Sequence, residues 1–218
     1  MASRLVIVAT VAVVLVGSVA ASDSGRSATE TAIYSVRGDP RLCPSPLCGG
    51  YWVALANGVR TRCADGTRNV RCYVAKAVGA RRRSVSVPND GLVRGSLEQA
   101  AFGDFGPLGV LLVVAAYTSA GTTPVSGGYY VVTDTGVRCI RAPCFSYRVT
   151  QANGRTRTLA SDIDLQAAQL TVGELARATA ALQTKNGLLA RGRFRSTADG
   201  GRVFRPSRVF LRVTQPRA

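Results

Sequence analysis

YSVRGDPRLCPSPLCGGYWVALANG, residues 34–58, returns without a gap as YVVTDTGVRCIRAPCFSYRVTQANG, residues 130–154. A repeat of this length indicates the architecture, because each copy is expected to form the same supersecondary unit. We expect two copies, residues 34–134 and 129–218, that share a strand at residues 129–134. The segments match at Tyr34/Tyr130, Val36/Val132, Cys43/Cys139, Cys48/Cys144, Tyr51/Tyr147, Val53/Val149 and Asn57-Gly58/Asn153-Gly154.

Each copy carries a hairpin signal. The run YWVALA, residues 51–56, alternates side chains between two faces and then meets Asn57-Gly58, after which VRTRC returns. The second copy has YRVTQA before Asn153-Gly154. An Asn-Gly pair between two such runs predicts a tight hairpin, because both turn positions need positive φ.

Two segments fit the capping box, in which a hydroxyl accepts from a helical amide and a Glu or Gln side chain reaches back. Residues 96–99, SLEQ, predict a short helix ending near Gly103, and residues 171–174, TVGE, predict a helix over 172–184. Two strands are expected after each helix. The predicted fold class is α+β: two pseudo-repeats, mainly antiparallel β with one helix per repeat. The strand order also allows an OB-like barrel.

The first residues, MASRLVIVATVAVVLVGSVAAS, have one arginine, an apolar run and then small residues. This pattern predicts a secretory signal peptide over residues 1–21, followed by a flexible leader over 22–33. The apolar run is shorter than the roughly 20 residues that span a bilayer. We therefore expect a protein that is secreted or held in the periplasm or cell envelope, with no integral membrane segment after cleavage.

Six cysteines follow the predicted signal, and disulfides are the default in an exported chain. The second copy holds only Cys139 and Cys144, so a pair confined to that copy must join them. By equivalence Cys43 joins Cys48, which leaves Cys63 with Cys72. Zinc is the competing use of such cysteines, but the spacing, the compartment and the absence of histidine disfavour it. We expect no metal and no cofactor.

The cysteine motifs resemble those of a family of exported proteins of GC-rich bacteria that is classified as a domain of unknown function. The resemblance rests on CPSPLCGGYWV (residues 43–53), CADG (63–66), CYV (72–74) and GVRCIRAPC (136–144), and so covers nearly the whole mature chain. It supports the architecture and implies no activity.

The chain has 28 Lys and Arg against 12 Asp and Glu, a formal net charge of +16, and only two of the cations are lysine. Arginine presents a planar fork of donors that fits phosphate and carboxylate. Anionic polymers or a cell-envelope surface are therefore the expected partners. The alternative is that the arginines reflect a coding bias and serve only solubility.

The chain has no histidine, which removes Ser-His-Asp and Cys-His nucleophile systems and the commonest general base. A pair of carboxylates could still hydrolyse glycosides. The candidates are Asp162 with Asp164, and Glu98 with Asp104, although solvated carboxylates are the simpler interpretation. We expect a protein that is not an enzyme.

Alternation places arginines on one face of two strands near the C-terminus, around an aromatic residue that could stack on a ligand. These anion-binding candidates are Arg191, Arg193, Arg195, Arg208, Phe210 and Arg212, with Arg81, Arg82 and Arg83 as a second cluster in a loop. Like charges directly opposite each other would destabilise the sheet, which favours an anionic ligand. A solvated sheet face is the competing interpretation.

The cysteine rings are the third candidate site. Rigid, exposed loops bind proteases with little entropic loss, and Arg141 in CIRAPC would enter a trypsin-like pocket. A structural staple is the simpler role. The sequence thus predicts an exported, disulfide-stapled, non-catalytic protein that binds an anionic polymer or envelope surface. Protease inhibition is the first alternative and a carboxylate glycosidase the second.

Overall fold

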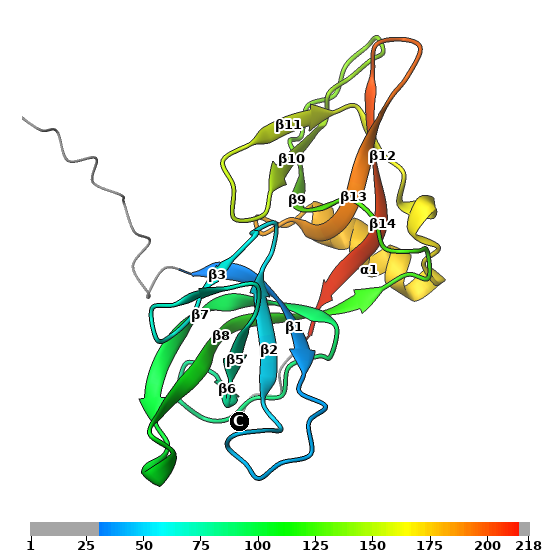
Figure 1. Cartoon of the computed structure of the whole chain (residues 1–218). Coiled ribbons are helices and arrows are strands. Elements are labelled where there is room, and N and C mark those ends of the chain that lie inside the picture. Colours follow the sequence, from blue (N-terminus) through cyan, green and yellow to red (C-terminus); the bar gives the residue numbers. More distant parts are fainter. Residues whose placement is uncertain (1–30, 214–218) are drawn as a thin grey trace, which may run out of the picture.

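The computed structural model describes residues 31–213 (Figure 1). The first half of the chain contains β1 (Ala32–Gly38), β2 (Tyr51–Leu55), β3 (Thr61–Arg62), β4 (Arg68–Asn69), β5 (Cys72–Val74), β6 (Lys76–Val78), β7 (Gly91–Ala101), the 3-10 turn η1 (Gly103–Phe105) and β8 (Pro107–Ala120). The second half contains β9 (Gly128–Asp134), β10 (Tyr147–Gln151), β11 (Arg157–Ala160), β12 (Asp162–Ile163), the 3-10 turn η2 (Leu165–Ala168), the helix α1 (Val172–Leu182), β13 (Leu188–Ser196) and β14 (Arg202–Arg212). The predicted signal peptide and most of the leader lie outside the described residues.

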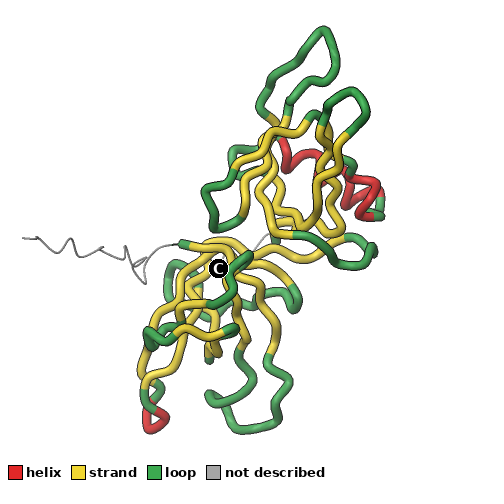
Figure 2. The backbone as a smooth tube through the Cα atoms, turned by 45° about the horizontal axis from the view of Figure 1, so that its top comes forward, coloured by secondary structure: helices red, strands yellow, loops and turns green. Residues whose placement is uncertain are grey.

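Twelve strands form one sheet with the order β11-β10-β9-β13-β14-β8-β7-β1-β2-β5, while β12 joins β14 and β6 joins β8 off this path. Within the described residues, these two off-path pairs are parallel and the other strand pairs are antiparallel. Figure 2 shows the two curved halves, which are joined where β14 pairs with β8. The end strands β11 and β5 each have a single partner within residues 31–213, so the sheet is not the closed OB-like barrel that the strand order allowed.

The expected helix at residues 96–103 is wrong, and with it the fold class of two repeats with one helix each. Residues 91–101 form β7, which lies between β1 and β8. The capping-box letters SLEQ are misleading here because pairing on both sides and burial outweigh local propensity. Gly95 is the residue that indicates a strand. The register of the β7–β8 pair shifts at Gly95, and a Cβ atom there would collide with the carbonyl oxygen of Leu112. An interior glycine of this kind is typical of a bulged strand.

The second predicted helix is confirmed as α1, which begins and ends close to the expected residues. The Thr171 hydroxyl accepts from the Glu174 amide, and the Glu174 carboxylate accepts from the Thr171 amide, so the capping box is complete. Ala178 and Leu182 pack into the core, whereas Val172 at the first turn is 89% exposed. Within residues 31–213, α1 is the only α-helix, and the molecule is mainly antiparallel sheet.

The strands that carry the repeated sequence pair in the same register in both halves. Tyr34 lies opposite Leu55 in β1–β2, and Tyr130 lies opposite Gln151, the residue equivalent to Leu55, in β9–β10. Both Asn-Gly turns are present, with φ 63° at Asn57 and φ 59° at Asn153, although neither following glycine has the expected positive φ. The second turn closes the predicted hairpin, in which β10 pairs with β11. The first predicted hairpin is wrong: β2 pairs with β1 and β5, β3 pairs with β4, and the Leu55 amide donates to the Thr61 hydroxyl in place of a ladder bond. The repeat itself stays our interpretation of the sequence, and this shared register is the structural feature that supports it.

Two apolar cores lie on the inner faces of the two halves, and a third joins them. Val53 and Val74 are buried in the first core, and Val132 and Phe204 in the second. The third core, at the junction, contains Ile33, Ala56, Leu92, Ala115, Tyr117, Ala152, Leu189 and Phe210. Because this third core draws on both halves, the halves are held together by buried apolar surface as well as by the β14–β8 pairing.

The two Asn-Gly turns meet at this junction. The Asn57 side-chain amide donates to the carbonyl oxygens of Tyr129 (2.7 Å) and Ala152 (3.1 Å), and its oxygen accepts from the Tyr129 amide at 2.8 Å. The Asn153 amide likewise donates to Ile33 (2.7 Å) and Ala56 (3.0 Å), and its oxygen accepts from the Ile33 amide at 2.8 Å. Each Asn-Gly turn therefore binds the backbone of the opposite half.

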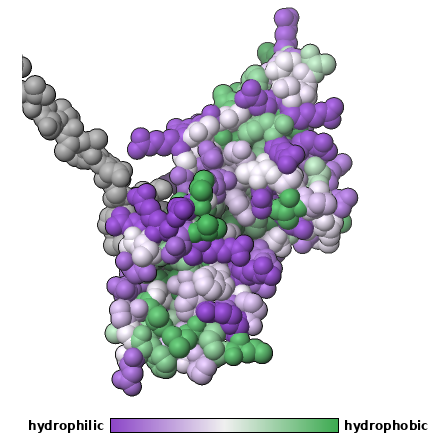
Figure 3. All heavy atoms as spheres, in the orientation of Figure 1, coloured by the Kyte–Doolittle hydropathy of each residue, from purple (hydrophilic) through white to green (hydrophobic). Residues whose placement is uncertain are grey.

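No helix in residues 31–213 is long and apolar enough to cross a membrane. In Figure 3 hydrophilic side chains cover much of both halves. Hydrophobic side chains gather at the lower end of the view, where Figure 1 draws the loop between β1 and β2. Leu42 in this loop is fully exposed.

Candidate functional site: an arginine groove

A hollow of about 580 Å³ lies where the outer face of β1 and β2 meets β13 and β14. We call it the arginine groove, because four arginines line it and Asp90 is the one acidic side chain among its lining residues. Its arginines are Arg37, Arg71, Arg191 and Arg208, and its aromatic side chains are Trp52, Tyr129 and Phe210. The groove therefore draws residues from both halves of the chain.

The floor of the groove follows from strand alternation. Arg37 lies opposite Trp52 across β1 and β2, so both side chains leave the sheet on the same face. Their neighbours Val36 and Val53 point the other way and are buried in the first core. The side chains of Arg37 and Arg71 are exposed and make no hydrogen bond or ion pair with another residue of the described chain. Two unpartnered guanidinium groups are thus presented on the floor.

The wall is built around Arg191. Its Nε donates to the carbonyl oxygen of Gly127 at 2.9 Å, and its Nη1 donates to the Tyr129 hydroxyl at 3.3 Å. The guanidinium carbon also lies 4.9 Å from the centre of the Tyr129 ring, in cation–π range. Tyr129 in turn packs on Phe210, with ring centres 5.9 Å apart. These contacts fix Arg191 in one position before any ligand arrives.

Arg208 lies directly opposite Arg191 across β13 and β14. Like charges in this position destabilise a strand pair unless something neutralises them. The Nη1 atom of Arg208 is buried and makes no hydrogen bond within residues 31–213. A buried donor without an acceptor is unfavourable, so this pair of arginines is better suited to an occupied groove than to an empty one.

The structure brings together only part of the predicted arginine face. A bulge between Arg191 and Gly192 shifts the register; Arg193 and Arg195 are exposed and do not line the groove. Arg212 is exposed beside β8, opposite Tyr117. Phe210 is only 6% exposed and belongs to the junction core, so it supports Tyr129 from below and does not form a free stacking surface.

The other predicted sites lie outside the groove. In the loop cluster, Arg81 and Arg83 are exposed, and Arg82 donates to Glu98 at 2.6 Å. Asp164 is the N-terminal cap of η2 and forms an ion pair with Arg205 at 2.9 Å, while Asp162 accepts from the amide of Ile163. Asp104 lies in η1. Glu98, Asp162 and Asp164 therefore hold local structure.

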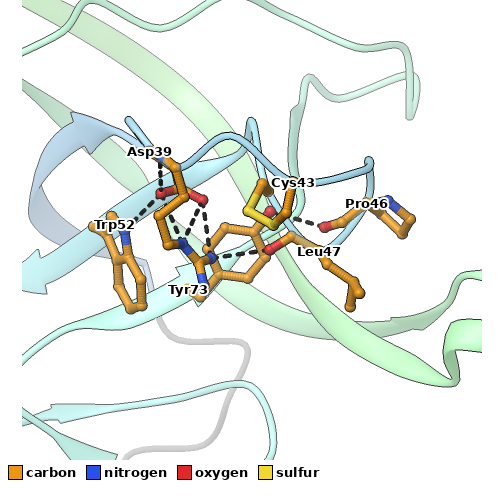
Figure 4. The surroundings of a disulfide bond; sticks show 8 residues. Asp39, Cys43, Pro46, Leu47, Trp52 and Tyr73 are labelled. Carbon is orange, nitrogen blue, oxygen red and sulfur yellow. Dashed lines mark hydrogen bonds and ion pairs between the residues drawn. A yellow bond between two sulfur atoms is a disulfide. The ribbon is translucent and has the colours of Figure 1, made fainter.

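The three disulfides join the predicted partners: Cys43 with Cys48, Cys63 with Cys72, and Cys139 with Cys144. The first ring packs beside Trp52 and Tyr73 (Figure 4). The Tyr73 hydroxyl donates to the carbonyl oxygen of Pro46 at 2.8 Å, inside the ring. The ring therefore rests on the strands that form the floor of the groove.

Asp39 and Arg41 hold Trp52 in place. The Arg41 guanidinium makes three hydrogen bonds to the Asp39 carboxylate, and the Trp52 indole nitrogen donates to the same carboxylate at 3.3 Å (Figure 4). The guanidinium carbon of Arg41 lies 5.1 Å from the ring centres of both Trp52 and Tyr73. Hydrogen bonds from Arg41 hold the pKa of Asp39 down at about 2. The carboxylate is therefore ionised, and Trp52 is fixed, at any ordinary pH.

The second ring has its own ion pair at its base. Arg138 donates to Asp134 at 2.7 and 3.0 Å, and Gln183 donates to the same carboxylate at 2.9 Å. The Arg138 guanidinium, with the Gly136 amide and Gln183, holds the pKa of Asp134 well below its usual range. At the tip, Arg141 is exposed and the side chain of Ile140 is completely so.

A second hollow of about 310 Å³ adjoins the groove, and Trp52 and Arg71 line both. Its other side chains include Asp65, Asn69, Tyr73 and Gln99. Within residues 31–213, no group of three or more His, Cys, Asp and Glu could hold a metal ion.

Sequence reasoning missed Arg37, Arg71, Trp52 and Tyr129 as members of one site. The alternation of YWVALA already separated Trp52 from the core face. No local sequence pattern could predict the long-range pairing that places β13 and β14 beside the outer face of β1 and β2. The useful signal was the excess of arginine on predicted outer faces, in both halves of the chain.

The comparisons with known proteins bear on the family alone. Neither a curated protein nor a solved structure matches the chain. A family model described as "Domain of unknown function (DUF6748)" matches residues 32–216, which include all three disulfides and both hollows. The resemblance seen in the cysteine motifs is thereby confirmed, and the chain belongs to the DUF6748 family.

Proposed function

We propose that this is an exported protein that binds an anionic polymer in the arginine groove. The observation that carries the proposal is the Arg191–Arg208 pair: two like charges directly opposite each other, one of them with a buried, unpartnered nitrogen. Arg37 and Arg71 add two further cations that bind nothing else in the described chain. Four guanidinium groups around one hollow match several carboxylates, sulfates or phosphates along a chain.

Three disulfides support the exported location, because such bonds persist in oxidising compartments and are rare in the cytosol. The formal charge of +16 supports attraction to polyanions over a distance. Aromatic contacts and the disulfide-anchored floor keep the groove in shape, so little entropy is lost on binding.

Calorimetric titration with heparin tests the proposal. Binding should weaken steeply as salt rises from low to physiological concentration, because ligand binding releases counterions. The double variant Arg37→Gln, Arg71→Gln should lose about tenfold or more in affinity, since it removes two charge-assisted contacts. Neither side chain has a partner in the described chain, so the fold should survive.

The matched control is Arg193→Gln, Arg195→Gln, which removes the same charge from exposed positions outside the groove. The control should keep nearly the wild-type affinity. Equal losses in the two double variants would show that heparin responds to net charge and would overturn the groove as the site.

Protease inhibition by the second cysteine ring is the second candidate. It is favoured by one observation: Ile140 and Arg141 are exposed at the tip of a loop whose base is fixed by a disulfide and by the Arg138–Asp134 pair. Inhibition of a trypsin-like protease that is abolished by Arg141→Ala would support it. Unchanged inhibition in that variant, or none in the wild type, would remove it.

A further inference from the structure

The second hollow continues the arginine groove but has a different chemistry. Trp52 and Arg71 line both hollows, so a chain leaving the groove passes over them into the second hollow. Beyond this boundary the lining side chains include one carboxylate, Asp65, and two amides, Asn69 and Gln99. A hollow lined by four arginines therefore adjoins one in which Arg71 is the one cation and the other hydrogen-bonding groups are neutral or acidic.

Asp65 is the one acidic side chain that lines the second hollow, which Arg71 borders on the side of the groove. Its Oδ1 accepts from both the hydroxyl and the amide of Thr67, at 2.7 and 3.0 Å. These bonds, the hydroxyl's first, lower the pKa of Asp65, so the carboxylate is ionised. An ionised carboxylate repels a phosphate, sulfate or uronate placed beside it, whereas it accepts readily from a hydroxyl group.

The amides of the second hollow fit the same kind of neutral unit. Gln99 is exposed, and its side chain makes no hydrogen bond with the rest of the described chain. The Asn69 amide nitrogen donates to Thr67 at 3.1 Å, which leaves its oxygen as an acceptor. With Asp65 these groups supply both donors and acceptors, as a ring bearing several hydroxyls requires.

Trp52 offers the apolar part of such a site. It is half-buried, and its position is fixed by the hydrogen bond to Asp39 and by Arg41. A rigid aromatic side chain beside hydrogen-bonding groups is suited to a ligand with an apolar face and polar edges. A sugar ring has both, whereas an inorganic phosphate chain has no apolar face.

From this change of chemistry we infer that the ligand is an acidic polysaccharide in which acidic and neutral sugars alternate. The acid group pairs with the arginines of the groove, and the next, neutral sugar lies over Trp52 against Asp65 and Gln99. This inference rests on the proposed function of the groove and adds the class of polymer. A nucleic acid or a polyphosphate, which carries a charge on every unit, would place one against Asp65.

Titration with defined oligomers tests the inference. The probes are glucuronate, a tetrasaccharide of alternating glucuronate and N-acetylglucosamine, a galacturonate tetramer, a phosphate tetramer and single-stranded DNA. The alternating tetrasaccharide should bind most tightly. Gln99→Ala should weaken it about fivefold, the effect of losing one net hydrogen bond. The same variant should leave binding of free glucuronate unchanged. Gln166→Ala, also exposed but outside both hollows, is the matched control.

Asp65→Asn gives the sharper result, because it removes the repulsion while keeping the shape of the side chain. This variant should raise the affinity of the galacturonate and phosphate tetramers and leave or lower that of the alternating tetrasaccharide. Tighter binding of DNA or phosphate by the wild type, or no change of preference in Asp65→Asn, would overturn the polysaccharide. Failure of the groove itself is seen separately, as an unchanged affinity in Arg37→Gln, Arg71→Gln.

Discussion

Asn57 and Asn153 make the same three side-chain hydrogen bonds, each with the backbone of the opposite half of the molecule. Positive φ at each position lets the turn form, and the amide then serves as donor twice and acceptor once. One residue type thus forms a turn and joins the two halves. Because Tyr129 begins the groove wall and is bound by Asn57, this junction also positions the candidate site.

Replacing Asn57 with Asp should destabilise the protein by about 2 kcal/mol or more, because a carboxylate would face the carbonyl oxygens of Tyr129 and Ala152 with no proton to donate. Asn186→Asp is the control, since Asn186 is exposed and its side chain makes no hydrogen bond in the described chain. Urea denaturation would measure both. Equal stabilities would contradict the role given to Asn57.

The hydrogen bonds of Asn57 and Asn153 also predict which asparagine deamidates first. An asparagine followed by glycine deamidates when the glycine nitrogen attacks the side-chain carbon, with loss of ammonia and uptake of water. Asn57 and Asn153 are held by their hydrogen bonds, whereas the side chain of Asn186, also before glycine, is not. Peptide mass spectrometry of incubated native protein should find conversion first at Asn186. Conversion at Asn57 as fast as at Asn186 in the folded protein would refute this, and urea should equalise the sites.

Gly95 should not tolerate a side chain. A Cβ there would meet the Leu112 carbonyl oxygen inside the β7–β8 pair, so Gly95→Ala is expected to destabilise by about 1 to 3 kcal/mol. Gly173→Ala provides a control of opposite sign, because nothing lies near its Cβ position and α1 should gain by about 1 kcal/mol. Thermal melts that move in the same direction for both variants would contradict the placement of β7.

Acid should release Trp52 at an unusually low pH. Asp39 has a pKa of about 2 in the folded protein against about 4 when unfolded. A lowered pKa contributes stability that is fully present above pH 4 and is lost as the pH falls through 2. Trp52 is the only tryptophan, so its fluorescence reports this change directly.

The wild type should show a fluorescence transition near pH 2 that Asp39→Asn lacks. Asp134→Asn, which removes the ion pair of the other ring, should keep the transition. A transition near pH 4 in the wild type would show that Asp39 is not held by Arg41.

Features set by neighbouring residues could be predicted from the sequence. The disulfide pairs, the capping box of α1 and the second Asn-Gly hairpin each depend on a few nearby positions, and the structure has them where expected. The first Asn-Gly turn formed without its hairpin, because β2 pairs with β1 and β5 instead. Residues 96–99 met the same capping criterion and became strand, because β1 and β8 pair with them from distant parts of the chain. A four-residue motif contains no information about strands that come from distant parts of the chain, so it could not predict this pairing.

For the same reason, the sequence predicted only part of the groove. Arg191 and Arg208 were identified as sharing a strand face, and they lie opposite each other. The bulge at Gly192, the burial of Phe210 and the approach of Arg37 and Arg71 depend on strand order. The pairing of β14 with β8 joins residues about 90 positions apart in the sequence. Hydrophobic periodicity reports only local structure and so gives no signal for such a pairing.

Trp52 emission during a heparin titration tests the central claim most directly, because Trp52 lines the groove and is the only tryptophan in the chain. We predict an emission change that saturates at the heparin concentration that saturates calorimetric binding. The change should shift to higher concentration in Arg37→Gln, Arg71→Gln, and not in Arg193→Gln, Arg195→Gln. Calorimetric binding with unchanged Trp52 emission would place the ligand elsewhere and contradict the arginine groove as the binding site.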